Sequence, residues 1–322
     1  MFLDPQFVET LLFTTQVTAP VFLLVFIGIA LGRIGFLTDE FNRVASRLVF
    51  TVSLPTLVFL NLSRTHLAEV FVLDLMVYAA VVTLLAFFWL VWRAQRTLVD
   101  YADRGPFVQG AFRGNLGILG LALAFNQYGE SGLALASVFL ALLIVMYNFL
   151  SVVALSLWRS EQGIAWGRMG LDILRNPLII AVSLALPFSL LEWSLPSVLE
   201  ETADYLAALT LPLALLCVGA ALNLRALQTT SRTALSSTAY KLVLLPVPMV
   251  LGAWLMGYEG QTLGVLFLIF GCPTAAASYV MARSMGSNAA LAANIVALTT
   301  LFSTVTLSLG VFVLHYYGLS SG

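Results

Sequence analysis

The sequence predicts an all-helical integral membrane protein with ten transmembrane helices, arranged as two inverted five-helix repeats. Composition gives the class: 60% of the 322 residues are hydrophobic, only 10% are charged, and the mean hydropathy is +0.98. Soluble domains carry about 25% charged residues. Two further observations give the arrangement: apolar runs of membrane-spanning length recur along the whole chain, and Pro and Gly landmarks repeat at one constant spacing.

About 20 apolar residues are needed to cross a hydrocarbon core of about 30 Å. Ten such runs are predicted, at residues 13–32, 40–62, 68–92, 106–127, 131–157, 173–191, 202–223, 233–256, 262–283 and 290–316. A charged stretch from Arg159 to Asp172 divides them near the midpoint of the chain. We therefore expect the first repeat over residues 1–160 and the second over residues 161–322.

The repeat follows from four pairs of helix-breaking residues that share one ungapped offset of 157 positions. The pairs are Pro20 with Pro177, Pro55 with Pro212, Gly114 with Gly271, and Gly129 with Gly286. Because each repeat holds an odd number of spans, the second copy enters the membrane upside down, which is an inverted-topology repeat.

The cationic residues give the orientation. With the N-terminus outside, the inner loops hold 12 of the 15 Lys and Arg residues and the outer loops hold only Arg64. Cytoplasmic loops are the ones enriched in Lys and Arg. Both termini are therefore expected outside, and the two remaining cations, Arg113 and Lys241, fall within spans.

Two predicted spans carry helix breakers at their centres. Residues 114–120 (GNLGILG) contain three glycines, and residues 271–274 (GCPT) place a proline beside a glycine. A broken helix in hydrocarbon leaves amide and carbonyl groups unpaired, at a cost of several kcal/mol each. Paired breaks in the two halves of a chain indicate the substrate site of a transporter.

Arg113 is the first candidate site residue. At a rise of about 1.5 Å per residue, it lies about 12 Å inside the fourth predicted span. An arginine within the membrane is costly, so its presence indicates a functional site. Gly114 permits close approach and Asn115 offers donors and acceptors, so the group is suited to a carboxylate. The alternative is a structural arginine that binds the freed carbonyls.

Lys241 in the eighth span and Asp74 in the third are candidates for charge coupling, with Asp74 the one carboxylate predicted well inside a span. Lys241 could instead extend its stem to the interface, and Asp74 could serve structural pairing.

The second break adds Cys272, Pro273, Thr274 and Ser278 as residues that could face a cavity. Asn148 in the fifth span and Asn294 in the tenth are also polar groups in apolar helices, where hydrogen bonds between helices are the commoner role. Gly28 and Gly32 form a pair that favours close helix packing.

Other functions lack their signatures. His66 and His315 form no HExxH motif, no phosphate-binding loop is present, and no basic run indicates nucleic acid. Cys217 and Cys272 both fall in apolar spans, so we expect packing roles rather than a disulfide or metal pair. No enzyme, no cofactor and no metal site is predicted, although H⁺ or Na⁺ could be a coupling ion.

Three segments resemble signatures of the auxin efflux carrier family: residues 110–124 (GAFRGNLGILGLALA), residues 273–283 (PTAAASYVMAR), and residues 52–59 (VSLPTLVF). The family includes plant auxin exporters and bacterial permeases for malonate and other organic acids, and its fold is similar to that of bile acid:sodium symporters. The resemblance runs along essentially the whole chain.

The resemblance implies that spans 1, 2, 6 and 7 form a scaffold that also forms a homodimer. Spans 3–5 and 8–10 would then form a transport domain that moves as an elevator. Asn115, Pro273 and Asn148 match family positions, while this chain has glycines in place of a proline at the first crossing and lacks the long cytosolic loop of the plant members. These differences indicate a bacterial inner-membrane protein.

The sequence thus predicts a secondary transporter in the lipid bilayer that moves a small organic anion by an elevator mechanism. Two alternatives remain at this point: a sodium-coupled symporter of a bile-acid-like amphipathic substrate, and a membrane ligand sensor that does not translocate.

Overall fold

The computed structural model describes residues 5–64, 73–158, 175, 177–222 and 231–320. Within these residues the chain is helical and forms no strand, apart from a single antiparallel bridge between Gly114 and Thr274. The all-helical prediction is therefore confirmed for the described part of the chain.

The helical elements, with π-helical segments written η, follow in chain order. They are α1 (Pro5–Arg33), α2 (Asp39–Leu48), η1 (Val49–Ser53), α3 (Leu54–Arg64), α5 (Leu73–Thr97), α6 (Tyr101–Phe112), η2 (Leu116–Gly120), α7 (Leu121–Ser156), α9 (Pro177–Leu191), α10 (Ser197–Ala208), α11 (Thr210–Ala220), α12 (Arg232–Ala239), η4 (Tyr240–Leu244), α13 (Pro246–Leu255), α14 (Gly260–Gly271), α15 (Ala277–Ser284) and α16 (Ala289–Tyr316).

Seven helical stretches in the described residues are long and apolar enough to cross a membrane, by length and composition. They are Pro5–Arg33, Asp39–Arg64, Leu73–Thr97, Leu116–Ser156, Ser197–Ala220, Arg232–Leu255 and Ala289–Tyr316. The apolar helices α9 and α14 are shorter, with 15 and 12 residues. At about 1.5 Å per residue, 12 residues cover about 18 Å, which is less than the hydrocarbon core.

The difference from ten continuous spans has local causes. The predicted spans 106–127 and 262–283 are each divided into two helices by an extended segment, as the glycines and Pro273 lead one to expect. Part of the predicted span 173–191 lies outside the described residues. The predicted span 131–157 runs on from the preceding helix in α7, with a change of direction at Gly129.

Gly129 and Gly286 make equivalent turns, each with a φ of 62°. This left-handed conformation carries a steric penalty for residues with a Cβ atom, and glycine adopts it readily. Gly129 bends α7 between its short first part and its long second part, and Gly286 separates α15 from α16.

The first group of packed helices contains α1, α3, α9, α10 and α11, with α1 against α11 and α3 against α9 and α10. Glycines allow α1 and α11 to approach backbone to backbone: a Cβ atom on Gly28 would overlap the Leu216 carbonyl, and one on Gly219 would overlap the Val25 carbonyl. The close packing predicted for Gly28 is thus confirmed.

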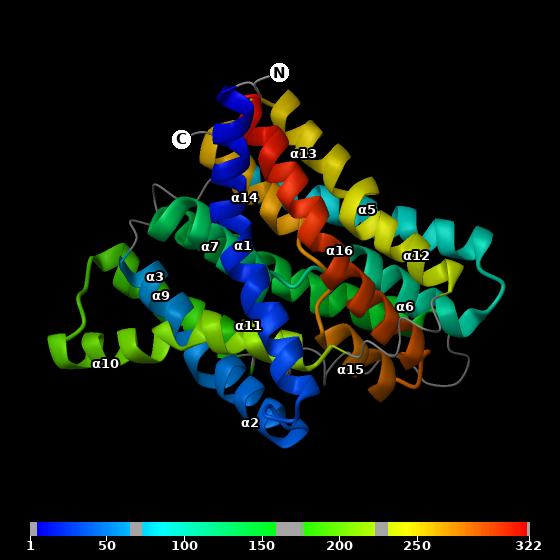
Figure 1. Cartoon of the computed structure of the whole chain (residues 1–322), viewed down its shortest axis with the longest axis horizontal. Coiled ribbons are helices and arrows are strands. Elements are labelled where there is room, and N and C mark those ends of the chain that lie inside the picture. The colour runs from blue at the N-terminus through cyan, green and yellow to red at the C-terminus, as the bar shows by residue number, and fades with distance from the viewer. Residues whose placement is uncertain (1–4, 65–72, 159–174, 176, 223–230, 321–322) are drawn as a thin grey trace.

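The second group contains α5, α6, α7 and α12 to α16. Here α6 packs against α12 and α16, and α14 packs against α7, α13 and α16. The two groups meet where α1 runs beside α16, and both ends of the described chain lie at the same end of the molecule (Figure 1). The Thr18 and Ser308 hydroxyls share a hydrogen bond of 3.0 Å across this contact.

The contact between α1 and α11 provides a first prediction. Gly28→Ala and Gly219→Ala are expected to lower the melting temperature of the purified protein, because each added methyl group overlaps a backbone carbonyl; such overpacking costs about 1–3 kcal/mol. Gly120→Ala is the matched control, since its methyl group would meet no atom closer than 3.7 Å. Equal melting temperatures for all three variants would contradict this account of the packing.

Candidate functional site

The site is built around a crossing of two extended segments. α6 ends at Phe112 and α14 ends at Gly271, and the segments that follow them pair through the Gly114–Thr274 bridge. The Asn115 N–H donates to the Pro273 carbonyl at 2.8 Å, and the Ala275 N–H donates to the Arg113 carbonyl at 3.3 Å. Each break thereby satisfies backbone groups that the other break leaves free.

The local sequence explains why both helices stop here. Pro273 has no N–H and disfavours helical geometry at the residue before it, and Cys272 accordingly has an extended φ of −63° and ψ of 149°. Gly114 allows the close approach, because a Cβ atom there would lie 2.7 Å from the Cys272 Sγ and would force that side chain to move. The two segments therefore cross where one of them lacks a side chain.

Hydroxyl groups from neighbouring positions hold the crossing in place. The Thr274 Oγ1 donates to the Gly110 carbonyl at 2.6 Å, while the Thr274 N–H donates to the Thr299 Oγ1 at 3.1 Å. On the other side of α6, the Ser237 Oγ donates to the Phe107 carbonyl at 3.0 Å. Two helices, α12 and α16, thus brace the broken end of α6 and its crossing.

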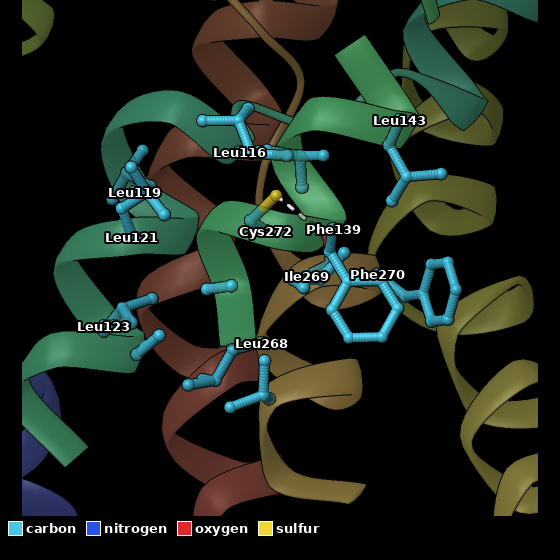
Figure 2. Close-up of a cluster of buried hydrophobic side chains, with 14 of the residues drawn as sticks. Leu116, Leu119, Leu121, Leu123, Phe139, Leu143, Leu268, Ile269, Phe270 and Cys272 are labelled. Atoms are coloured by element: carbon cyan, nitrogen blue, oxygen red, sulfur yellow. Dashed lines mark hydrogen bonds between the residues drawn. The ribbon is translucent and has the colours of Figure 1, made fainter. Parts of the chain in front are cut away.

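Apolar packing surrounds the second break. Figure 2 shows Cys272 among side chains of η2, α7 and α14, including Leu116, Phe139 and Ile269. The Cys272 side chain is fully buried and its thiol donates to the Ile269 carbonyl at 3.1 Å. This residue packs the crossing, as the sequence predicts for both cysteines.

A cavity of about 420 Å³ lies against the crossing, between the two helix groups. On the side of the second group it is lined by Arg113, Gly114, Asn115, Leu116, Gly117, Ile118, Leu140, Ile144, Tyr147, Ala275, Ala276, Ala277, Val280 and Met281. On the side of the first group, with α2 and η1 that pack against it, the cavity is lined by Ser46, Val49, Phe50, Leu178, Ala214, Cys217, Val218 and Ala221. The lining is mostly apolar, with Arg113 as its one charged side chain.

Arg113 is 7% exposed and its guanidinium meets only neutral groups. It donates from Nη2 to the Asn148 Oδ1 at 2.9 Å, and from Nη1 to the Ser151 Oγ at 3.2 Å and the Met281 Sδ at 2.7 Å. The ion pairs of the described residues involve Arg43 and Arg64, and none includes Arg113. A guanidinium has five N–H donors, so capacity remains for an anion.

Helix starts at the same cavity add positive partial charge. Leu116, Gly117 and Ile118 form the first turn of η2, which continues into α7, and Ala277 begins α15. The first N–H groups of a helix have no partner within it and favour anions. The cavity thus combines a buried guanidinium with backbone donors.

The structure brings some predicted site residues together and separates others. Arg113, Gly114 and Asn115 line the cavity, and Asn148 binds Arg113. Cys272, Pro273, Thr274 and Ser278 do not line this cavity; the first three instead form the crossing. The buried Ser278 Oγ has no hydrogen-bond partner within the described residues, and a binding role for it stays a prediction.

Asp74 lies in the first turn of α5 and its side chain is exposed in the structure, and its role in charge coupling stays a prediction. Its carboxylate accepts a hydrogen bond of 2.6 Å from the Tyr258 hydroxyl, and this bond raises the pKa of Tyr258 to about 12. Tyr258 precedes α14, whose other end forms the crossing, so Asp74 is remote from the cavity.

Lys241 lies in η4, is 3% exposed, and donates from Nζ to the Phe270 carbonyl at 2.8 Å. The alternative in which its stem extends to the membrane interface is therefore wrong. Lys241 also does not line the cavity.

Sequence reasoning missed Tyr147, Ser151 and Met281 as neighbours of Arg113. A signal was present for Ser151, because residues three apart share one face of a helix and Ser151 is three residues after Asn148. Met281 gave no comparable signal, since a methionine in an apolar helix is typical packing.

The contact between the two breaks provides a second prediction. Gly114→Ala is expected to lower the melting temperature, because the new methyl group would meet the Cys272 Sγ at 2.7 Å. Cys272→Ala removes that sulfur, so the double variant should be more stable than the sum of the single effects predicts, with a coupling energy of about 0.5–3 kcal/mol. Strict additivity in this double-mutant cycle would contradict the proposed contact.

Two known proteins are similar to this chain along most of its length. The chain is 24% identical over 302 residues to an "Uncharacterized transporter" of Methanothermobacter thermautotrophicus, covering 92% of this chain and 97% of that protein. It is 27% identical over 301 residues to a "Putative malonate transporter" of Rhizobium meliloti, covering 91% and 93%.

The family described as membrane transport protein (Mem_trans), the auxin efflux carrier family, matches residues 13–163 and 167–311. These two segments include both broken helices and every residue that lines the cavity. The chain therefore belongs to the auxin efflux carrier family of membrane transport proteins.

Proposed function

We propose that this protein is a secondary transporter of a small organic anion and that it binds a substrate carboxylate at Arg113. The observation that carries the proposal is the buried Arg113 guanidinium, which lines a cavity of about 420 Å³ and has no acidic partner among the described residues.

Arg113 lacks an opposite charge among the described residues. A charge removed from water is costly unless it is paired and hydrogen-bonded, and Asn148, Ser151 and Met281 supply only neutral contacts to Arg113. A carboxylate would supply the missing charge and could form two parallel hydrogen bonds with the guanidinium. The backbone donors of η2 and α15 favour the same ligand.

The proposed substrate is a small carboxylate. The name of the Rhizobium meliloti relative, which mentions malonate, supports this substrate class. Apart from Arg113, the polar side chains in the cavity lining are few, including Ser46, Asn115 and Tyr147, so Arg113 is the group that would select for the carboxylate.

The ten-span inverted repeat is supported by the positions of the helices. Adding 157 to the bounds of α2–α3 gives residues 196–221, beside α10–α11 at 197–220. The same shift moves α5 to 230–254, beside α12–α13 at 232–255, and α6 to 258–269, beside α14 at 260–271.

Unusual backbone conformations follow the same offset. Gly129 and Gly286 share a φ of 62°, and Gly35 with a φ of 78° corresponds to Glu192 with a φ of 53°. Glu192 is the one residue other than glycine with a positive φ in the described chain. A side chain rarely adopts this conformation, so its occurrence at the equivalent position supports a common ancestor for the two halves.

An elevator mechanism is supported by two cavities between the helix groups. The second cavity, of about 510 Å³, is lined by residues that include Pro20, Arg64, Glu130, Asp204 and Pro212. It shares no lining residue with the first. In this proposal the first group is the scaffold, the second group is the transport domain, and sliding of the second group moves Arg113 from one cavity toward the other.

The cavity at Arg113 is assigned to the inner side of the membrane. Its lining includes Ser46 of α2, a helix that also carries Arg43 and Arg47, and residues of α15, which has Arg283 in its last turn. Arginines near the ends of spans concentrate on the cytoplasmic side. The described conformation is then the inward-facing state.

Arg113→Gln is expected to abolish uptake of a labelled dicarboxylate such as malonate into proteoliposomes, because glutamine retains hydrogen bonding but lacks the charge. Arg96→Gln, which changes an exposed arginine in the last turn of α5, is the matched control and should transport normally. Normal uptake by a folded Arg113→Gln protein would overturn the assignment.

The orientation is tested with single added cysteines. Val99 is 92% exposed and Val198 is 73% exposed, whereas the native Cys217 and Cys272 are buried. Val198→Cys should react with an impermeant thiol reagent in intact cells, and Val99→Cys should react only after permeabilisation, with the unaltered protein as the blank. The reverse pattern would refute the outward location of both termini.

A further inference from the structure

Lys241 is a second buried cation that the carboxylate site does not use. Its ammonium donates at 2.8 Å to the carbonyl of Phe270, in the last turn of α14. Neighbouring carbonyls have other donors, since the Cys272 N–H binds the Leu268 carbonyl and the Cys272 thiol binds the Ile269 carbonyl. Lys241 thus satisfies one of the carbonyls freed by the break.

This end of α14 is a position that attracts a cation. The last carbonyls of a helix lack helical partners and carry the negative end of the helix dipole. In transporters with broken helices, such carboxyl ends and the adjacent unwound backbone coordinate the coupling ion. Here the covalently attached ammonium of Lys241 lies at that position.

The ammonium also reaches the first break. A Cβ atom on Gly114 would lie 3.4 Å from the Lys241 Nζ, so the charge lies beside both arms of the crossing. The surroundings are closed: a space of only about 10 Å³ remains beside Lys241, Tyr147 and Phe270. This volume is at the lower limit for one water molecule, so little free space remains beside the ammonium.

No acidic side chain among the described residues forms an ion pair with Lys241. Its positive charge is therefore balanced only by the carbonyls and the helix dipole. The neutral side chains of Thr83, Tyr147 and Cys272 are other polar groups near it.

We propose that the Lys241 ammonium is a fixed cation that takes the place of a coupling metal ion at the crossing, so that this protein binds and moves its substrate without Na⁺. The inference rests on the proposed transport function and adds the ion requirement to it. It assigns Lys241 a positioning role, because the ammonium holds the arm that carries Cys272 and Pro273 against the arm that carries Gly114.

The first test uses the unaltered protein. Its melting temperature in detergent, measured without substrate, should be the same in NaCl, KCl and choline chloride at equal ionic strength. Its uptake of labelled malonate should likewise be independent of Na⁺. A melting temperature or an uptake rate that rises specifically with Na⁺ would overturn the proposal.

The second test changes the charge. Lys241→Met keeps much of the side-chain volume without the ammonium and is expected to lower the melting temperature and abolish uptake, whereas Arg96→Met, at an exposed position, should change neither. Wild-type stability and uptake in Lys241→Met would overturn the proposal. If that variant does not fold, the comparison of salts on the unaltered protein still tests whether the protein requires Na⁺.

The two proposals fail separately. The melting-temperature comparison requires no substrate, so Na⁺ dependence there would refute the fixed cation even if Arg113 binds a carboxylate. Conversely, uptake by Arg113→Gln would refute the carboxylate site and leave the melting-temperature result unaffected.

Discussion

The structure depends on one constraint: backbone groups in a membrane interior must find partners within the protein. Two helices stop inside apolar spans, and the crossing of residues 113–115 with residues 273–275 pairs the groups that the breaks release. Neither break can be satisfied in this way without the other. Because pairing requires contact, the packing of α12, α14 and α16 around the crossing follows from the same constraint.

The crossing also separates the two buried cations. Arg113 continues from α6 into the cavity, whereas Lys241 approaches from η4 and binds the carboxyl end of α14. One cation is thus accessible to a ligand and the other is committed to the backbone. In our proposal, this difference is why the anion binds at Arg113 and not at Lys241.

Much of this frame could be predicted from residues that break helices. Gly114, Pro273 and Gly129 act locally, so their effects can be read from their own positions, and Arg113 in an apolar span indicated the candidate site because a buried charge is rare. Asp74 shows where a local pattern carries less information. Its depth was inferred from an estimated span boundary, and the structure places its exposed side chain in the first turn of α5.

The sequence by itself determined the membrane class, the family resemblance and the positions of the two breaks, because composition and helix-breaking chemistry are local properties. Only the tertiary structure decided which way each side chain points at the crossing. Thr274 and Cys272 face backbone carbonyls, while Asn148 and Ser151 face Arg113. These contacts join different helices, as Arg113 and Asn148 do, or segments more than 100 residues apart, as Thr274 and Gly110 do, and no local pattern records them.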